Sequence, residues 1–115
     1  MSQPKVQIDV RSPAEGIRIL DIRGEITASA EEALSAVSGT AGSDVRAIIL
    51  NLSEVPSIDS LGAGLLITLL ARVRKQRQRL LAYGLNEHCR HAFELTHLDE
   101  IVGVYTDEAE ALGSF

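Results

Sequence analysis

The chain has 115 residues, of which 45% are hydrophobic, 23% charged and only 3% aromatic. Its net charge of −5 repels a phosphate backbone, and two tyrosines, two phenylalanines and no tryptophan offer little for bases to stack on. These values exclude a typical nucleic-acid-binding protein and predict one globular domain over residues 1–115.

The N-terminal segment predicts an antiparallel hairpin. Val6, Ile8 and Val10 alternate with polar residues, so the first strand is expected to bury one face, and this alternation predicts no signal peptide. Ser12–Gly16 has the composition of a turn, and Ile17–Arg23 that of a second strand. The short connection makes the two strands antiparallel partners.

A short helix is expected after this hairpin. Ser29 and Glu32 have the spacing of a capping box, which predicts a helix that begins there and runs to about Val37. Gly39 is the expected stop signal, within an exit loop over residues 38–44.

The segment from Ala47 to Arg79 dominates the pattern. Ala47–Leu52 is an apolar run dense in branched residues, typical of a strand buried on both faces. A helix follows, with Ser60 as its expected N-cap. Its predicted apolar stripe consists of Leu61, Leu65, Leu66, Leu69, Leu70 and Val73.

Strands and helices alternate in the rest of the chain. Leu80–Tyr83 is the fourth strand, Glu87 to about Thr96 a helix, and Val102–Tyr105 the last strand. Asp107, Glu108 and Glu110 open a terminal helix whose expected apolar side is Ala109, Ala111 and Leu112. The order β-β-α-β-α-β-α-β-α predicts an α/β fold with a mixed, largely parallel sheet, an N-terminal antiparallel hairpin and about four helices.

The most distinctive chemical feature is a serine hydroxyl, that of Ser60, at the start of the central helix. A phosphoryl group there is favoured by the partial positive charge of a helix N-terminus. Gly62 and Gly64 each cost the first turn about 1 kcal/mol relative to alanine, which indicates a close approach by another group. Two interpretations stay open for that group: a partner protein, or the sheet of the same chain.

Other chemistries have little support. Gly62-Ala63-Gly64 lacks the third glycine of a dinucleotide loop, so no nucleotide cofactor is expected. His88, Cys89 and His91 have no second ligand cluster, so no metal is expected; Cys89 is predicted to be buried and the two histidines exposed. No catalytic triad or pair can be specified, which predicts a protein that is not an enzyme. A single cysteine also excludes an intramolecular disulfide and is typical of the cytoplasm.

A group of cations follows the central helix: Arg72, Arg74, Lys75, Arg77 and Arg79. They are expected to form a solvated face that complements the helix dipole, with contact to an acidic partner or anionic lipid as the alternative. The apolar stretch over residues 61–71 is too short to cross a bilayer, so no direct membrane insertion is expected.

The chain resembles a STAS domain, the fold of bacterial anti-sigma factor antagonists and of the cytoplasmic tails of sulfate transporters. The matching segments are Gly24-Glu25-Ile26, Ile48 to Leu52, Ile58-Asp59-Ser60 with Gly62 and Gly64, and the ending from Leu95 to Ile101 with Glu108-Ala109. Ser60 corresponds to the serine that the anti-sigma kinase phosphorylates in an Asp-Ser-Ser/Thr-Gly-Leu-Gly motif. Leu61 and Ala63 depart from that motif.

The resemblance implies partner switching in the cytoplasm. The unphosphorylated protein would bind an anti-sigma factor, a serine kinase of the histidine-kinase-like ATPase type, and phosphorylation at Ser60 would release it until a serine phosphatase resets the switch. The implied partner-binding residues are Glu25, Thr27, Ser57, Asp59, Ser60, Leu61, Gly62, Ala63 and Gly64. The alternative, which Leu61 favours, is a STAS scaffold that does not switch, in a stress-sensing complex or in a lipid or anion transporter.

Overall fold

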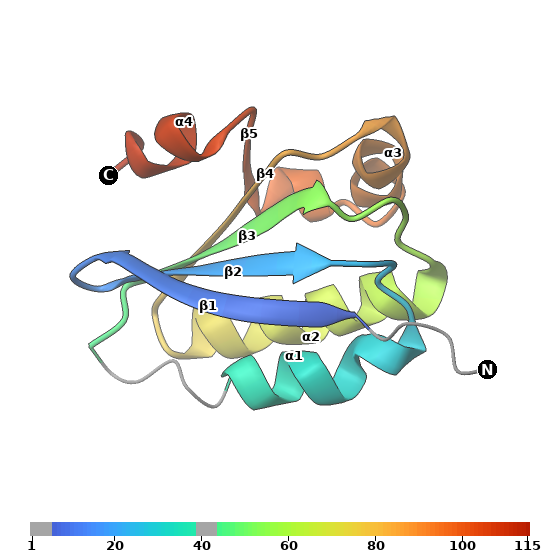
Figure 1. Ribbon diagram of the computed structural model, residues 1–115, viewed down its shortest axis with the longest axis horizontal. Coiled ribbons are helices and arrows are strands. Elements are labelled where there is room, and N and C mark those ends of the chain that lie inside the picture. The colour runs from blue at the N-terminus through green and yellow to red at the C-terminus, as the bar shows by residue number, and fades with distance from the viewer. Residues whose placement is uncertain (1–5, 39–43) are drawn as a thin grey trace.

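The computed structural model describes residues 6–38 and 44–115, which form a sheet with helices on both of its faces (Figure 1). The strands are β1 (Gln7–Ala14), β2 (Ile17–Arg23), β3 (Ala47–Glu54), β4 (Arg79–Tyr83) and β5 (Gly103–Tyr105). The α-helices are α1 (Glu31–Ser38), α2 (Ser60–Lys75), α3 (Glu87–Leu95) and α4 (Glu108–Leu112). Two 3₁₀ turns, η1 (Ala28–Ala30) and η2 (Leu98–Glu100), complete the order.

The sheet has the order β1-β2-β3-β4-β5. β1 and β2 are antiparallel, whereas β2, β3, β4 and β5 are parallel neighbours. The predicted α/β fold with an antiparallel edge hairpin is therefore confirmed. In a parallel sheet the carboxyl ends of the strands meet at one edge, and this edge carries the start of α2.

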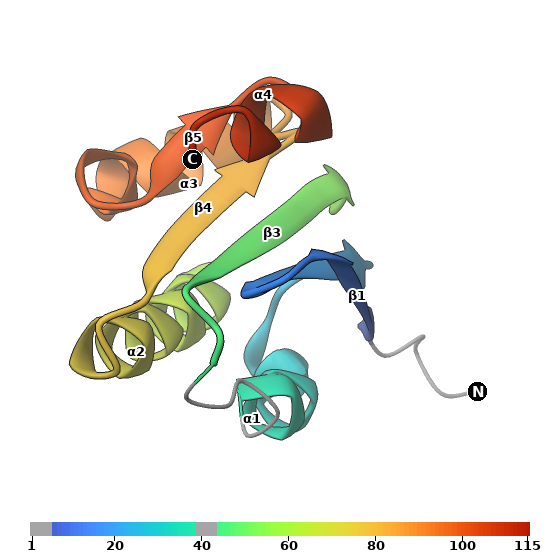
Figure 2. The same cartoon turned by 90° about the vertical axis from the view of Figure 1, so that its left-hand side faces the viewer.

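Two apolar cores lie on opposite faces of the sheet. The larger core joins β2, β3 and β4 to α1, α2 and α3, and includes Leu34, Leu66 and Phe93. The smaller core lies under α4, where Ala111 packs with Ile19, Ile49 and Leu81. Figure 2 shows α4 on the opposite side of the sheet from α1 and α2. One short helix thus covers the second face.

The first hairpin differs from the prediction in its turn. β1 continues through Ser12 and Pro13 to Ala14, which pairs with Ile17, so only Glu15 and Gly16 form the turn. Gly16 has a φ of +80°, a conformation that glycine adopts without strain. β1 is an edge strand whose residues are almost all exposed, and Val10 is 42% exposed. An edge strand needs no apolar alternation, so the pattern underestimated its length.

The predicted capping box at Ser29 is wrong. Thr27 caps the turn η1, its hydroxyl accepting from the N–H of Ser29 at 3.3 Å, and α1 begins only at Glu31. Thr27 has the extended backbone of a cap, whereas Ser29 is already inside the turn. The predicted stop at Gly39 lies outside the described residues, as does most of the predicted loop over residues 38–44.

The later elements follow the prediction closely. α3 ends one residue before Thr96, and β5 begins one residue after Val102. In α4 the prediction of the apolar side was partly wrong, because Ala109 is exposed, whereas Ala111 is buried and Leu112 half-buried. The differences in α3 and β5 are at element ends, where hydrogen-bonding patterns fray, whereas the error at Ala109 concerns which face of α4 is buried.

A hydrogen-bonded network ties the first hairpin to α4. The Arg11 guanidinium donates to both Asp21 and Glu108, and Asp21 also accepts from the Asn51 amide at 2.8 Å. The Tyr83 hydroxyl donates to Glu108 at 2.9 Å. The Arg11 guanidinium holds the pKa of Asp21 and of Glu108 below their ordinary values. Burial, with the Glu108 carboxylate, raises the pKa of Tyr83 to about 12.

Acid is expected to weaken this network. Because both carboxyl pKa values are lower in the folded state, their contribution to stability is complete above about pH 5 and is lost as the pH falls through the lowered values. Urea unfolding at a series of pH values should show a steeper loss for wild type than for Arg11→Gln, in which the cation is missing. Equal acid sensitivity of the two proteins would contradict the role given to Arg11.

Candidate functional site

The site predicted around Ser60 is built from two loops at the carboxyl edge of the sheet. The loop after β2 and the loop after β3 are joined by a parallel bridge between Ile26 and Ile58. The N–H of Ile26 donates to the carbonyl of Ser57 at 3.1 Å, and the N–H of Asp59 donates to the carbonyl of Ile26 at 3.2 Å. The two loops therefore form one continuous surface.

The N-cap of α2 is Asp59, not Ser60 as predicted. Asp59 has an extended backbone, φ −89° and ψ 179°, and its Oδ1 accepts from the N–H of Gly62 at 2.8 Å. Ser60 is the first helical residue and is exposed. Asp and Ser are comparably good caps, so the residue types alone did not distinguish them. The bridge at Ile58 fixes the backbone just before the helix, and this places the N-cap at Asp59.

Two substitutions test which residue caps the helix. Asp59→Ala should lower the free energy of unfolding by about 1 kcal/mol, because the Gly62 N–H loses its acceptor. Ser60→Ala should change it by only a few tenths of a kcal/mol. Urea unfolding of both variants measures the difference, and a larger loss in Ser60→Ala would restore Ser60 as the cap.

The two glycines of the first turn have different surroundings. An ideal Cβ at Gly62 would lie 1.9 Å from the carbonyl oxygen of Ile26, so the loop after β2 requires a glycine there. At Gly64 a Cβ would meet nothing within 4 Å. For Gly62 the close approach therefore comes from the same chain, although from the bridging loop and not from the sheet.

Exposure divides the predicted partner-binding residues. Five are exposed: Glu25, Asp59, Ser60, Leu61 and Gly64. Thr27 and Ser57 are half-buried, while Gly62 is buried and Ala63 is only 4% exposed. A rigid partner can thus reach the exposed and half-buried residues, but not Gly62 and Ala63. Leu61 was predicted on the buried stripe of the helix, which is wrong, because it is 65% exposed.

The surface around Ser60 combines a helix N-terminus with carboxylates. The Asp59 carboxylate already accepts one N–H of the first turn, and Glu25 is exposed on the adjoining loop. The Ser60 side chain is outside the core, so a phosphoryl group fits there without repacking. It would bring about −1.5 to −2 charges to a surface that is already acidic.

Sequence reasoning missed the carbonyl of Ile26, which contacts Gly62 and accepts from Asp59. No local pattern signals such a contact, because its residues are more than thirty positions apart. Gly24, whose φ is +103° and whose N–H donates to Glu54, was the available hint that the chain turns sharply here.

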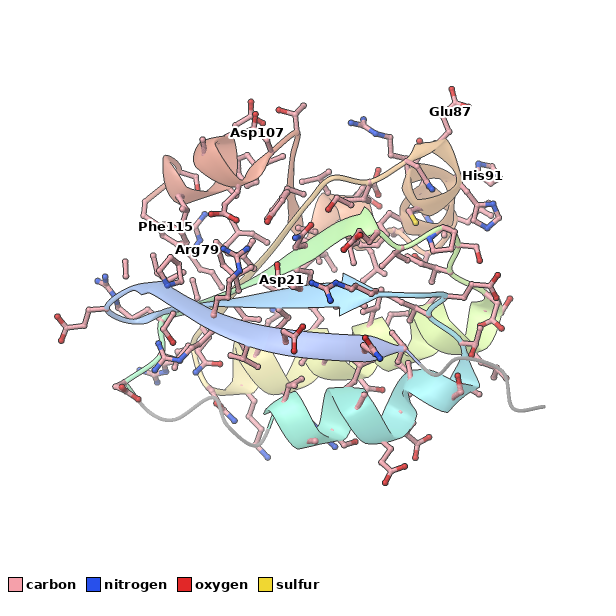
Figure 3. All side chains as sticks on the ribbon, viewed as in Figure 1. Asp21, Arg79, Glu87, His91, Asp107 and Phe115 are labelled. Carbon is pink, nitrogen blue, oxygen red and sulfur yellow. The ribbon has the colours of Figure 1, made fainter. Side chains whose placement is uncertain are left out.

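The other candidate sites gain no support from the described residues. No group of three metal-ligating side chains is found among residues 6–38 and 44–115. Cys89 is fully buried, as predicted, and burial raises the pKa of its thiol. His88 and His91 are exposed, and Figure 3 shows His91 pointing away from the sheet.

The cations after residue 71 are exposed, as predicted for a solvated face: Arg72, Arg74, Lys75, Arg77 and Arg79. The Arg79 guanidinium lies over the Phe115 ring, 5.0 Å from its centroid (Figure 3). Within the part of the chain that is described, none of the helices has the length and apolar character needed to cross a membrane.

Known proteins share this fold and this sequence pattern. The STAS domain family model matches residues 8–111. An anti-sigma-B factor antagonist of Listeria monocytogenes is 29% identical over 97 residues, 81% of this chain and 82% of the relative.

Two solved structures extend the comparison. The Bacillus cell fate determinant SpoIIAA in its phosphorylated form superposes with a TM-score of 0.73 at 22% identity, covering 94% of this chain and 98% of that one. A sulfate transporter family protein of Wolinella succinogenes gives 0.78 at 24% identity, covering 86% and 84%. Both similarities concern the fold. Because the family model spans nearly all of the sheet and its helices, the chain belongs to the STAS domain family.

Proposed function

We propose that this protein is an anti-sigma factor antagonist of the cytoplasm, a binding protein with no catalytic role. It binds an anti-sigma factor, a serine kinase of the histidine-kinase-like ATPase type, through the surface around Ser60. Phosphorylation of Ser60 releases the kinase, and a serine phosphatase restores binding. The Listeria relative, named as an anti-sigma-B factor antagonist, and the phosphorylated SpoIIAA structure support this choice.

The observation that carries the proposal is the exposed Ser60 at the meeting point of two bonded loops. Glu25 and Thr27 lie on the loop after β2, and Ser57 and Asp59 lie on the loop after β3, which leads to Ser60. A partner that covers this surface must enclose Ser60. A phosphoryl group there would have to be desolvated next to Asp59, and each 1.4 kcal/mol of that cost lowers affinity tenfold.

Calorimetric titration with the purified anti-sigma ATPases of the source genome, each tested singly, examines the proposal. Ser60→Ala should bind one of them about as tightly as wild type, and Ser60→Asp at least about tenfold more weakly. Ser12→Asp, an exposed serine on β1, controls for added charge and should bind normally. When wild type is incubated with this ATPase and ATP, the phosphate should be transferred to Ser60, and mass spectrometry locates the modified residue. Equal affinities for Ser60→Ala and Ser60→Asp would reject the switch.

A second candidate is a scaffold subunit without a switch, in a stress-sensing complex or a lipid or anion transporter. The observation that favours it is Leu61, a large apolar side chain 65% exposed directly beside Ser60. The Wolinella structure belongs to a sulfate transporter family protein, which gives this candidate a structural precedent. It predicts a stable assembly whose affinity is the same for Ser60→Ala and Ser60→Asp.

A further inference from the structure

The outer face of α2 carries no charge over its first three turns. The exposed residues between positions 60 and 71 are Ser60, Leu61, Gly64, Ile67, Thr68 and Ala71. A surface helix normally presents charged side chains to water, and depletion of charge marks the centre of protein interfaces. The charged residues of this helix begin only at Arg72. The part of this face that borders α1, at Thr68, is therefore suited to being covered by a protein.

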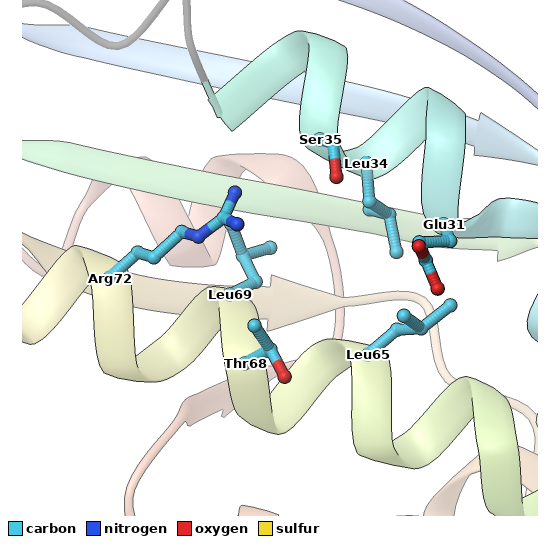
Figure 4. Close-up of a pocket in the computed structure, with 7 residues that line it drawn as sticks. All are labelled: Glu31, Leu34, Ser35, Leu65, Thr68, Leu69 and Arg72. Atoms are coloured by element: carbon cyan, nitrogen blue, oxygen red, sulfur yellow. The ribbon is translucent and has the colours of Figure 1, made fainter.

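A groove runs along one side of this face, between α1 and α2 (Figure 4). Its volume is about 210 Å³, enough to admit an apolar side chain of a partner. Leu34, Leu65 and Leu69 supply its apolar lining, with Ser35 and Thr68 beside them. Glu31 stands at one end and Arg72 at the other, with the leucines between them. The groove is thus apolar in the middle and oppositely charged at its ends.

Leu61 lies one helical turn before Leu65, between the groove and Ser60. Leu61, Leu65, Thr68 and Arg72 follow one another at spacings of three or four, which places them in one row along the helix. From Leu61 to Arg72 this row is about 16 Å long, the length of three turns of an α-helix. A row of this length, with the groove beside its second half, fits an amphipathic helix laid along it.

We propose that the anti-sigma factor docks an amphipathic helix in this groove, an inference that rests on the proposed function. The helix carries apolar residues at i, i+4 and i+7 that face Leu61, Leu65 and Thr68. A cation at one end meets Glu31, and a carboxylate at the other meets Arg72. The two end charges fix the direction of the helix, because the reversed orientation places like charges together. Leu61, one turn before the groove on the side of Ser60, is the residue that selects an apolar anchor.

A charge placed in the groove tests this docking. Thr68→Glu puts a carboxylate among the leucines, whereas Ile67→Glu puts the same charge one residue earlier, about a third of a turn away from the groove. Thr68 and Ile67 are both exposed, and thermal melting of the variants checks that each remains folded. The probe is the purified anti-sigma ATPase that binds wild type in calorimetric titration.

Thr68→Glu is expected to weaken binding about a hundredfold, because the new carboxylate is desolvated against an apolar residue of the partner and competes for Arg72, four residues later. Ile67→Glu is expected to weaken binding by less than about fivefold. The double reversal Glu31→Arg with Arg72→Glu should weaken binding about tenfold, because like charges of the groove and the docked helix then meet at both ends. Equal losses in Thr68→Glu and Ile67→Glu, or no loss in Thr68→Glu, would overturn the groove while leaving the antagonist function intact. If wild type binds none of the ATPases, the proposed function itself fails, and with it this docking site.

A second copy of this chain is the competing occupant. Sedimentation of wild type and Thr68→Glu decides between the two: a wild-type dimer that Thr68→Glu converts to a monomer overturns the proposal, and a monomer in both cases supports it.

Discussion

Gly62→Ala is expected to destabilise the protein by about 3 kcal/mol or more. The added Cβ would lie 1.9 Å from the Ile26 carbonyl oxygen and 2.5 Å from its carbon, and both are backbone atoms. This carbonyl cannot easily retreat, because it accepts the N–H of Asp59 next to the Ile26–Ile58 bridge. Either the helix or the loop after β2 must move.

Gly64→Ala is the matched control for this prediction. It lies two residues later in the same turn region, and its Cβ would meet no atom within 4 Å. Alanine there should raise the free energy of unfolding by about 0.5 to 1 kcal/mol, the usual gain in a helix. Urea unfolding of both variants provides the measurement. Similar effects of the two substitutions would show that helix propensity, and not the contact with Ile26, governs this turn.

Ala111→Glu is expected to detach α4 from the sheet. Ala111 is fully buried against Ile19, Ile49 and Leu81. Burying a carboxylate there costs more than the short helix gains by docking, so we expect a loss of about 2 to 4 kcal/mol and exposure of this apolar face. Urea unfolding gives the loss, and binding of a fluorescent apolar dye reports the exposure.

Ala109→Glu serves as the control, since Ala109 is exposed on the same helix. A carboxylate there lies near the N-terminus of α4, where it is favourable, so stability should change by less than about 0.5 kcal/mol. Dye binding by Ala111→Glu equal to that of Ala109→Glu would mean that α4 stays docked and that the smaller core accommodates the charge.

The fold was predictable wherever the pattern along the chain was itself strong. β3 is a continuous branched apolar run, and α2 repeats its buried leucines at helical spacing, so both elements were identified. The alternation of strands and helices then fixed the topology, because parallel strands require crossovers. The start of β1 was identified from its alternation, but its end at Ser12–Ala14 was missed, because these exposed residues carry no apolar signal.

The site was predictable in its location but not in its contacts. Ser60 was placed correctly at the start of α2, yet the cap is Asp59, because two adjacent cap-forming residues are distinguished only by the backbone that precedes them. The role of Gly62 was left undecided, since the carbonyl that it faces belongs to a residue 36 positions earlier, at Ile26. Leu61 is exposed because the buried face of α2 begins at Gly62 and Ala63, which the spacing of the leucines alone did not show.

The bridge between Ile26 and Ile58 has a consequence for engineering new specificity. The two loops share backbone hydrogen bonds, and Gly62 fits only against the Ile26 carbonyl as the present loop positions it. A recognition surface transplanted from a relative would therefore have to be moved as a matched pair of segments, residues 24–27 together with 55–62. If either segment were grafted alone, the backbone hydrogen bonds between the two loops and the fit of Gly62 against Ile26 would be lost. The hybrid would then lose its fold before its new specificity could be measured.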